Sequence, residues 1–180
     1  MNCSNLSEIT IGEGTRVDNS AFDGAGITKI TVKNGANLSA NSIKQCTKLK
    51  NIIIEDNVTI DSSVFSNCGN IESVVMGKNI KIKGKLFENS KVKTATVESL
   101  SEVGVGALRY VGSALQGNII INEGVTIISS DSFNGCNNMA SVSIPSTVTE
   151  IGSGAFSGCT SLETVKLPNR LKTLGWRSIL

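Results

Sequence analysis

Two stretches near the carboxyl end of the chain repeat one phrase: SFNGCNNMASVSIP at residues 132–145 and AFSGCTSLETVKLP at residues 155–168. In both, Phe-x-Gly-Cys leads into an apolar-x-x-apolar-x-apolar run that ends at a proline. Because alternate side chains of a strand lie on opposite faces, the run predicts a short strand with one buried side. A unit of this size cannot bury that side alone, so we predict that successive copies stack on one another.

The same phrase recurs along the whole chain at intervals of 21 to 24 residues. Its copies start near residues 6, 27, 49, 71, 92, 116, 139 and 162, which predicts a single array over residues 1–180. The aromatic position is filled by Phe22, Phe65, Phe87, Phe133 and Phe156, and by Ile43, Leu108 and Ile179 where Phe is missing. Aromatic residues make up only 4% of the chain, so we expect these phenylalanines inside a mainly aliphatic core.

The cysteines recur with the same period, so we interpret cysteine as the residue of one fixed position in the repeat (the cysteine letter). Each lies three residues before the start of a unit, at Cys3, Cys46, Cys68, Cys136 and Cys159. We expect the last four to be small buried thiols in the structural core, as free cysteine often is. Disulfides between neighbouring coils, Cys46 with Cys68 and Cys136 with Cys159, remain an alternative. No metal site is expected, because zinc sites use close pairs such as Cys-x-x-Cys and the chain has none.

The stretches IPSTVTEIG (residues 144–152) and AFSGCTSLETV (residues 155–165) resemble the BspA-like, Treponema-type leucine-rich repeat of cell-surface proteins. The match is close over residues 123–174 and looser over residues 3–93. The resemblance implies a mostly β solenoid: a right-handed superhelix of about eight coils, with one parallel β-sheet face and short turn or 3₁₀ segments opposite. It also implies a location at the cell surface or outside the cell.

The repeat is irregular in one unit and looks truncated at both ends. The unit at residues 92–115 lacks the Phe and Cys letters and is the longest, so we expect a distorted coil there. Neither end shows the polar outer face that normally caps a solenoid. We therefore expect a fragment of a longer protein, or closure of the ends by end-to-end self-association. Trp176, the only tryptophan, is interpreted either as a cap over the last coil or as an exposed contact.

Composition excludes several classes of function. Seventeen basic residues against 15 acidic give a net charge of +2 without a basic run, so a nucleic-acid partner is not expected. The chain has no histidine, the commonest general base, and its carboxylates are dispersed. No apolar run approaches the roughly 20 residues of a membrane-spanning helix. We predict no enzymatic activity, no cofactor and no direct membrane insertion.

The outward positions of the strand phrase are the candidate binding residues, because solenoids usually bind through an extended face. In the six-residue run apolar-x-x-apolar-x-apolar, the fifth residue of each copy (the fifth letter) forms one column along the array, and the third residue (the third letter) adds two asparagines. These residues are Thr10, Thr31, Ile53, Val75, Thr96, Ile120, Ser143 and Lys166, with Asn51 and Asn118. One interpretation is that β-branched residues simply suit a strand surface. The other is an uncharged strip for a partner, with Ile53 and Val75 as an exposed apolar patch.

These observations predict a non-enzymatic, adhesin-like module that binds a protein or a glycan on a surface or secreted protein. The surface location comes from the resemblance alone. Two other hypotheses remain: a structural spacer that carries another domain, and an intracellular scaffold with reduced thiols.

Overall fold

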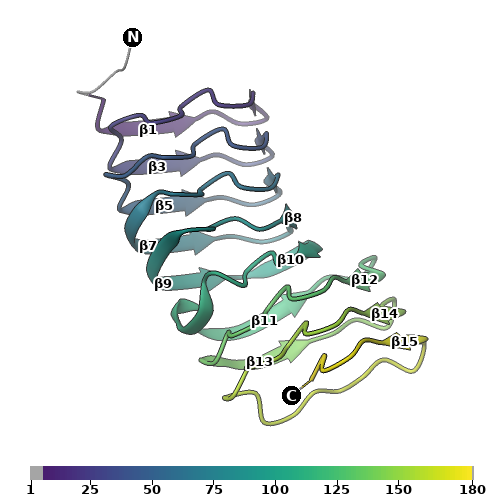
Figure 1. The fold of residues 1–180 in the computed structure, drawn as a ribbon. Helices are drawn as coiled ribbons and strands as arrows, with labels where there is room; N and C mark the ends of the chain where they lie inside the picture. The colour runs from purple at the N-terminus through teal and green to yellow at the C-terminus, as the bar shows by residue number, and fades with distance from the viewer. Residues whose placement is uncertain (1–5, 180) are drawn as a thin grey trace.

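The computed structural model describes residues 6–179, which form a mostly β parallel solenoid of about eight coils. Figure 1 shows the coils stacked along one axis, with the first coil and the last at opposite ends. Each regular coil contains the predicted strand, a corner, a second short strand and a turn segment that carries the aromatic position. The predicted repeat solenoid is thereby confirmed.

The strand phrases of the first five units form one parallel sheet, called sheet A, in the order β1-β3-β5-β7-β9. Equivalent letters lie opposite one another, as in the pairs Ile9 with Ile30 and Ile30 with Ile52. This register follows from the alternation of buried and exposed side chains, because a slip of one residue would expose every buried one. The strands are β1 (Glu8–Ile11), β3 (Lys29–Val32), β5 (Asn51–Ile54), β7 (Gly69–Met76) and β9 (Ser90–Val97).

A second parallel sheet, called sheet B, runs along the solenoid on another face, whereas the sequence predicts only one sheet. Its path is β15-β14-β12-β10-β8-β6-β4-β2, and most of its strands are only two residues long. They are β2 (Arg16–Val17), β4 (Asn37–Leu38), β6 (Thr59–Ile60), β8 (Ile80–Gly84), β10 (Ser99–Val105), β12 (Ile127–Ile128), β14 (Glu150–Ile151) and β15 (Thr173–Leu174). Two residues are too few to show alternation in the sequence, so these strands exist only because neighbouring coils pair.

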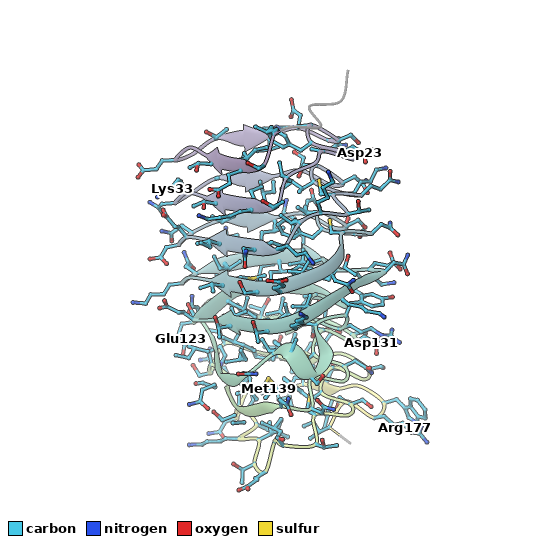
Figure 2. All side chains as sticks on the ribbon, turned by 90° about the vertical axis from the view of Figure 1, so that its left-hand side faces the viewer. Asp23, Lys33, Glu123, Asp131, Met139 and Arg177 are labelled. Carbon is cyan, nitrogen blue, oxygen red and sulfur yellow. The ribbon has the colours of Figure 1, made fainter. Side chains whose placement is uncertain are left out.

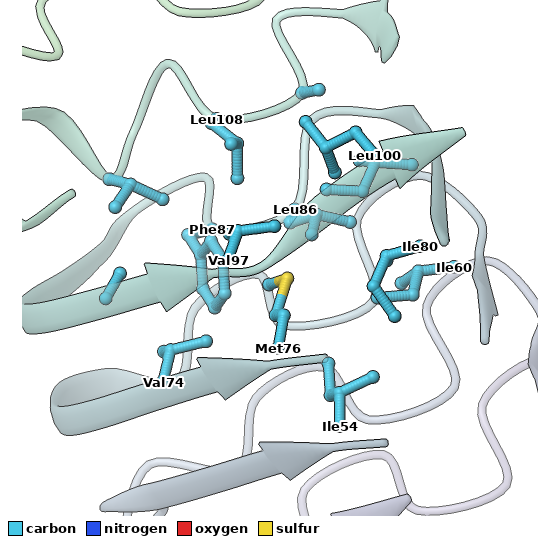
Figure 3. Close-up of a cluster of buried hydrophobic side chains, with 14 of the residues drawn as sticks. Ile54, Ile60, Val74, Met76, Ile80, Leu86, Phe87, Val97, Leu100 and Leu108 are labelled. Carbon is cyan, nitrogen blue, oxygen red and sulfur yellow. The ribbon is translucent and has the colours of Figure 1, made fainter. Parts of the chain in front are cut away.

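The core lies between sheet A, sheet B and the turn segments. Figure 3 shows side chains from all three meeting there, among them Met76 of β7, Ile80 of β8 and Phe87 of a turn. Phe65, Phe87, Phe133 and Phe156 are buried as predicted, whereas Phe22 of the first coil is only partly buried. The rings form two separate stacks, Phe65 on Phe87 with centroids 5.5 Å apart and Phe133 on Phe156 at 5.2 Å.

The unit at residues 92–115 is distorted, as predicted, and it joins two kinds of coil. At the corner between the sheets, three residues separate Met76 from Ile80, but only two separate Val97 from Leu100. Along sheet B the change is opposite: one residue separates the buried Ile80 and Ile82, whereas two separate Leu100 and Val103, with a bulge. Every later coil also has two residues between the corresponding buried positions of sheet B. This unit therefore absorbs the change from a repeat of 21 to 22 residues to one of 23.

Sheet A stops at this junction. β9 makes only an isolated bridge, Ala95 with Leu115, to the chain below it. The next strand, β11 (Gly117–Ile121), pairs instead with the start of β10, where Ile120 lies opposite Ser99, and with β13 (Met139–Ser143). The connection contains the 3₁₀ turn η1 (Gly112–Ala114). Figure 1 shows β11 and β13 displaced sideways from β1–β9.

The last coil is looser than the others. The strand expected at residues 162–167 is not formed, and the chain rejoins the array only at β15. In Figure 1 this segment bows away below β13. Trp176 is 71% exposed, so the interpretation of this residue as a cap is wrong.

Candidate functional site

The fifth-letter column of sheet A is continuous only across the first five coils. Strand register brings Thr10, Thr31, Ile53, Val75 and Thr96 side by side. The rest of the expected column is separated from this face in three ways. Ile120 lies opposite Ser99 rather than Thr96, Ser143 follows Ile120 in the lower pair of strands, and Lys166 lies in the last coil, outside any strand.

Ile53 and Val75 form the apolar centre of the upper face. They lie directly opposite each other on β5 and β7 and are 36% and 47% exposed. Asn51 lies in the adjacent third-letter column, where its Oδ1 accepts a hydrogen bond from Ser73 Oγ at 3.0 Å. In the lower block Ser141 Oγ donates the equivalent bond to Asn118 Oδ1 at 2.8 Å. Both asparagines thus serve at least to tie neighbouring strands together.

A shallow groove of about 420 Å³ borders the apolar pair at the corner between the two sheets. Its apolar side is Ile53 and Val75, and its polar side comes from the corner residues Asn34, Glu55, Asp56, Asn57 and Glu98. Gly77 forms part of the floor, and a Cβ atom there would collide with Asp56 Oδ1. The groove therefore depends on a glycine at this corner, which periodicity of apolar letters did not reveal.

Hydrogen bonds hold the polar rim of the groove in place. Lys33 Nζ donates to Glu55 Oε1 at 2.6 Å, and this bond lowers the pKa of Glu55 and raises the pKa of Lys33. Asp56 Oδ1 accepts the backbone N–H of Lys78 at 2.8 Å. Because Asp56 has no ion-pair partner among residues 6–179, its second oxygen is available to a partner.

An asparagine ladder supports the same corner. Asn57 Nδ2 donates to Asn34 Oδ1 at 2.8 Å, and Asn79 Nδ2 donates to Asn57 Oδ1 at 2.7 Å. The ladder then skips the irregular coil, since Asn122 Nδ2 reaches Asn79 Oδ1 at 3.3 Å. The residue missing at the corner of that coil explains the skip, because the shortened corner contains only Glu98 and Ser99.

The cysteine letter has a structural role that the sequence predicted only in part. Each of the four described thiols is free, buried and directed at a backbone carbonyl of the preceding coil. The acceptor is the residue at the aromatic position: Cys46 Sγ to Phe22 O at 3.1 Å, Cys68 Sγ to Ile43 O at 3.3 Å, Cys136 Sγ to Leu108 O at 3.6 Å and Cys159 Sγ to Phe133 O at 3.2 Å. Cys3 lies outside the described residues.

Ser90 takes the cysteine position in the fourth coil, which our sequence interpretation missed. Its Oγ donates to Phe65 O at 2.8 Å, the same cross-coil bond that the thiols make. A signal was present, because Ser90 follows Cys68 at the repeat interval of 22 residues. Burial raises the pKa of Cys46 and Cys159 to about 11 and that of Cys68 and Cys136 to about 12. These thiols are therefore protonated and unreactive at neutral pH.

A second groove, of about 380 Å³, lies on the outer face of sheet B at the junction. Gly104, Val105, Gly124 and Ile127 line it, with Lys83 and Glu102 among the charged residues. It opens where β10 and β12 share a single register pair, Val103 with Ile128. Opposite charges on its rim give no preference for an anionic or a cationic ligand.

Neither groove has a cluster of side chains that could form a metal centre. Within residues 6–179, no three His, Cys, Asp or Glu side chains converge in a way that could hold a metal ion. The described part of the chain also has no helix of the length and apolarity that a membrane crossing requires.

The stacked parallel coils, the two sheets along the axis and the recurrent Phe and Cys letters define a leucine-rich-repeat solenoid. The family model for the BspA type leucine rich repeat region matches six copies, over residues 1–93 and 105–178. The chain belongs to this family. The unmatched residues between these ranges fall in the irregular unit. Neither the curated proteins nor the solved structures contain a significant match.

Proposed function

We propose that this protein is a non-enzymatic interaction module of a surface-displayed or secreted protein and that it binds another protein through sheet A of its first five coils. The observation that carries the proposal is the exposed pair Ile53 and Val75 beside the corner groove. A solenoid of this family offers an extended face for partners rather than an enclosed reaction chamber. The family's cell-surface character supports an adhesin-like role.

The chemistry of the face favours a protein segment over a glycan. An extended peptide can cover Ile53 and Val75 with an apolar side chain and meet Asp56 with a basic one. Carbohydrate recognition commonly adds an aromatic ring that stacks on the sugar, whereas the outward positions of sheet A within residues 6–97 hold Thr, Ser, Asn, Ile, Val and charged residues. Glycan binding is therefore the alternative that the experiment must separate.

The test compares one double variant with a matched control. The variant Ile53→Asp with Val75→Asp places two charges at the centre of the proposed surface, whereas Ile127→Asp places a charge at an exposed isoleucine on sheet B. Each protein is applied to immobilised extracellular-matrix proteins and to a glycan array. We expect the wild type and Ile127→Asp to retain a protein ligand and the double variant to lose at least about tenfold in affinity.

Three outcomes contradict the proposal. Equal retention of all three proteins would remove the upper face as the contact surface. Binding to glycans alone would assign the carbohydrate alternative, and no retention on either panel would favour the spacer. Circular dichroism of the double variant checks that the solenoid is intact.

A further inference from the structure

Formal charge changes sign between neighbouring coils over the first four coils, and the two end coils are opposite in sign. The first coil, residues 6–26, has four carboxylates against Arg16, and the last, residues 162–180, has four basic residues against Glu163. The coils starting at residues 6, 27, 49, 71, 92, 116, 139 and 162 have net charges of −3, +4, −2, +3, 0, −2, −1 and +3, in that order. The two end coils are therefore opposite in sign.

Most of the ion pairs join neighbouring coils. Within residues 6–179, six of the eight ion pairs join a basic residue in one coil to an acidic residue in the next. Examples are Lys29 with Glu8 at 3.5 Å and Arg109 with Asp131 at 3.1 Å. Cross-coil ion pairing is thus a recurrent part of how the first six coils pack.

Among residues 6–179, no coil follows the last one to supply such a partner. Its cations are exposed and form no ion pair within residues 6–179; they are Lys166, Arg170, Lys172 and Arg177. Apolar side chains lie beside them, with Leu167 at 37% and Leu174 at 49% exposure. The Arg177 guanidinium lies 4.3 Å from the centre of the exposed Trp176 ring, and Figure 2 shows Arg177 projecting from this end of the molecule.

The first coil presents matching chemistry at the other end. Glu8, Glu13, Asp18 and Asp23 are all exposed, and Leu6 is an exposed apolar residue beside them. β2 in this coil and β15 in the last coil are the two outer strands of the same parallel sheet. A second copy in the same orientation therefore meets β15 with its own β2, as each coil meets the next inside the array. The β1 strand of the second copy then lies next to residues 162–167, which have the sequence pattern of a strand but do not form one.

We propose that this chain associates head to tail, with the basic last coil of one copy docked on the acidic first coil of a second copy. The contact resembles the coil-to-coil arrangement of the first coils: parallel strand edges, opposite charges and apolar side chains between them. It leaves the outward face of sheet A around Ile53 and Val75 free, so it is independent of the surface proposed for a partner protein.

Charge reversal at each end provides the test. One variant combines Lys172→Glu with Arg177→Glu, and the other combines Glu13→Lys with Asp18→Lys. These two carboxylates are chosen because neither forms an ion pair with the second coil. The matched control, Lys81→Glu with Lys83→Glu, reverses two exposed lysines of β8 in the middle of sheet B. Sedimentation equilibrium is measured on the full chain at about 50 mM and 500 mM salt, a range over which screening of exposed charges changes strongly.

For the wild type and the control, we expect the average molar mass to rise with protein concentration and to fall as the salt concentration is raised. Each end variant has like charges at both ends, so its association constant should fall at least about tenfold. An equimolar mixture of the two end variants should associate again, because the acidic end of one then meets the basic end of the other. Hydrogen exchange at residues 162–172 should slow on association.

The proposal is overturned if the wild type stays monomeric at low salt, or if the end variants associate as strongly as the wild type. A monomeric wild type that binds phosphatidylserine vesicles through Lys172 and Arg177 would assign the basic coil to a lipid surface instead. The variant Ile53→Asp with Val75→Asp should associate like the wild type, so failure here is distinct from failure of the proposed function.

Discussion

The two blocks of the solenoid differ in how completely neighbouring coils satisfy one another. In the upper block, residues 6–97, five strands pair in full register and the buried letters are almost completely shielded from solvent. In the lower block, residues 117–179, sheet A is absent, the strand phrases form only β11 and β13, which join sheet B through β10, and the last coil forms only β15. Yet the lower block has the more regular sequence, with the clearest Phe, Cys and Pro letters. Regular letters therefore do not by themselves produce ordered strands, because a strand also needs a paired neighbour.

The largest effect on stability is expected from replacing a core phenylalanine with alanine, and the loss should differ between the blocks. Phe65→Ala removes a ring stacked on Phe87 and enclosed by complete coils, so it should cost about 3–5 kcal/mol of unfolding free energy. Phe156→Ala should cost less, because below it lies the half-buried Ile179 of the loose coil. Urea denaturation measures both. Equal losses would show that the last coil packs as tightly as the inner ones.

The next effect tests the junction between the blocks. A Cβ atom at Gly104 would collide with the carbonyl oxygen of Lys83, so Gly104→Ala forces β8 and β10 apart. We expect a loss of about 1–3 kcal/mol, as for other overpacked sites. Gly12→Ala is the control, because the added Cβ there meets only the Thr15 hydroxyl at 3.3 Å. If thermal melting of both variants matches the wild type, the close approach of the two strands at the junction is not needed.

The smallest effect concerns the buried thiols, one from each block. Burial raises the pKa of Cys68 and Cys136 from 9.0 to about 12, so the folded protein keeps these protons when the unfolded chain loses them. Their contribution to stability is complete below pH 9 and is lost as the pH rises from 9 towards 12. Each thiol should lower the unfolding free energy by about 1 kcal/mol at pH 10 relative to pH 8.

Cys68→Ser and Cys136→Ser should each remove that part of the pH dependence, because serine does not ionise in this range. Ser90 already occupies the same position in the fourth coil, so the fold tolerates the substitution. Urea titrations at the two pH values provide the measurement. An unchanged slope for Cys136→Ser alone would mean that the lower block admits water to its thiol in the native state.

Much of the fold could be predicted because apolar periodicity fixes which side chains face inward. The starts of the units, the aromatic core positions, the buried cysteines and the distorted unit all follow from that pattern. Sheet B was missed because two-residue strands such as Arg16–Val17 leave no periodic trace. The break between Thr96 and Ile120 was missed because the residue missing at the corner between Val97 and Leu100 lies outside the strand phrases, whose internal spacing is unchanged.

The candidate surface was predictable in part. Adjacency of Ile53 and Val75 follows from the letters alone, since equivalent letters stack. The groove beside them depends on the turn of the chain around Asp56 and Gly77, and turns contribute no apolar period.

The amino-acid sequence by itself determined that this chain stacks, which side chains fill its interior and which letters face outward, because a repeat of apolar residues can be buried only against its own neighbours. Tertiary structure alone decided where the stack shifts, that a second sheet runs along it, and that the last coil is loose. Each of these depends on whether a backbone segment finds a partner in the adjoining coil, and that partner is distant in sequence.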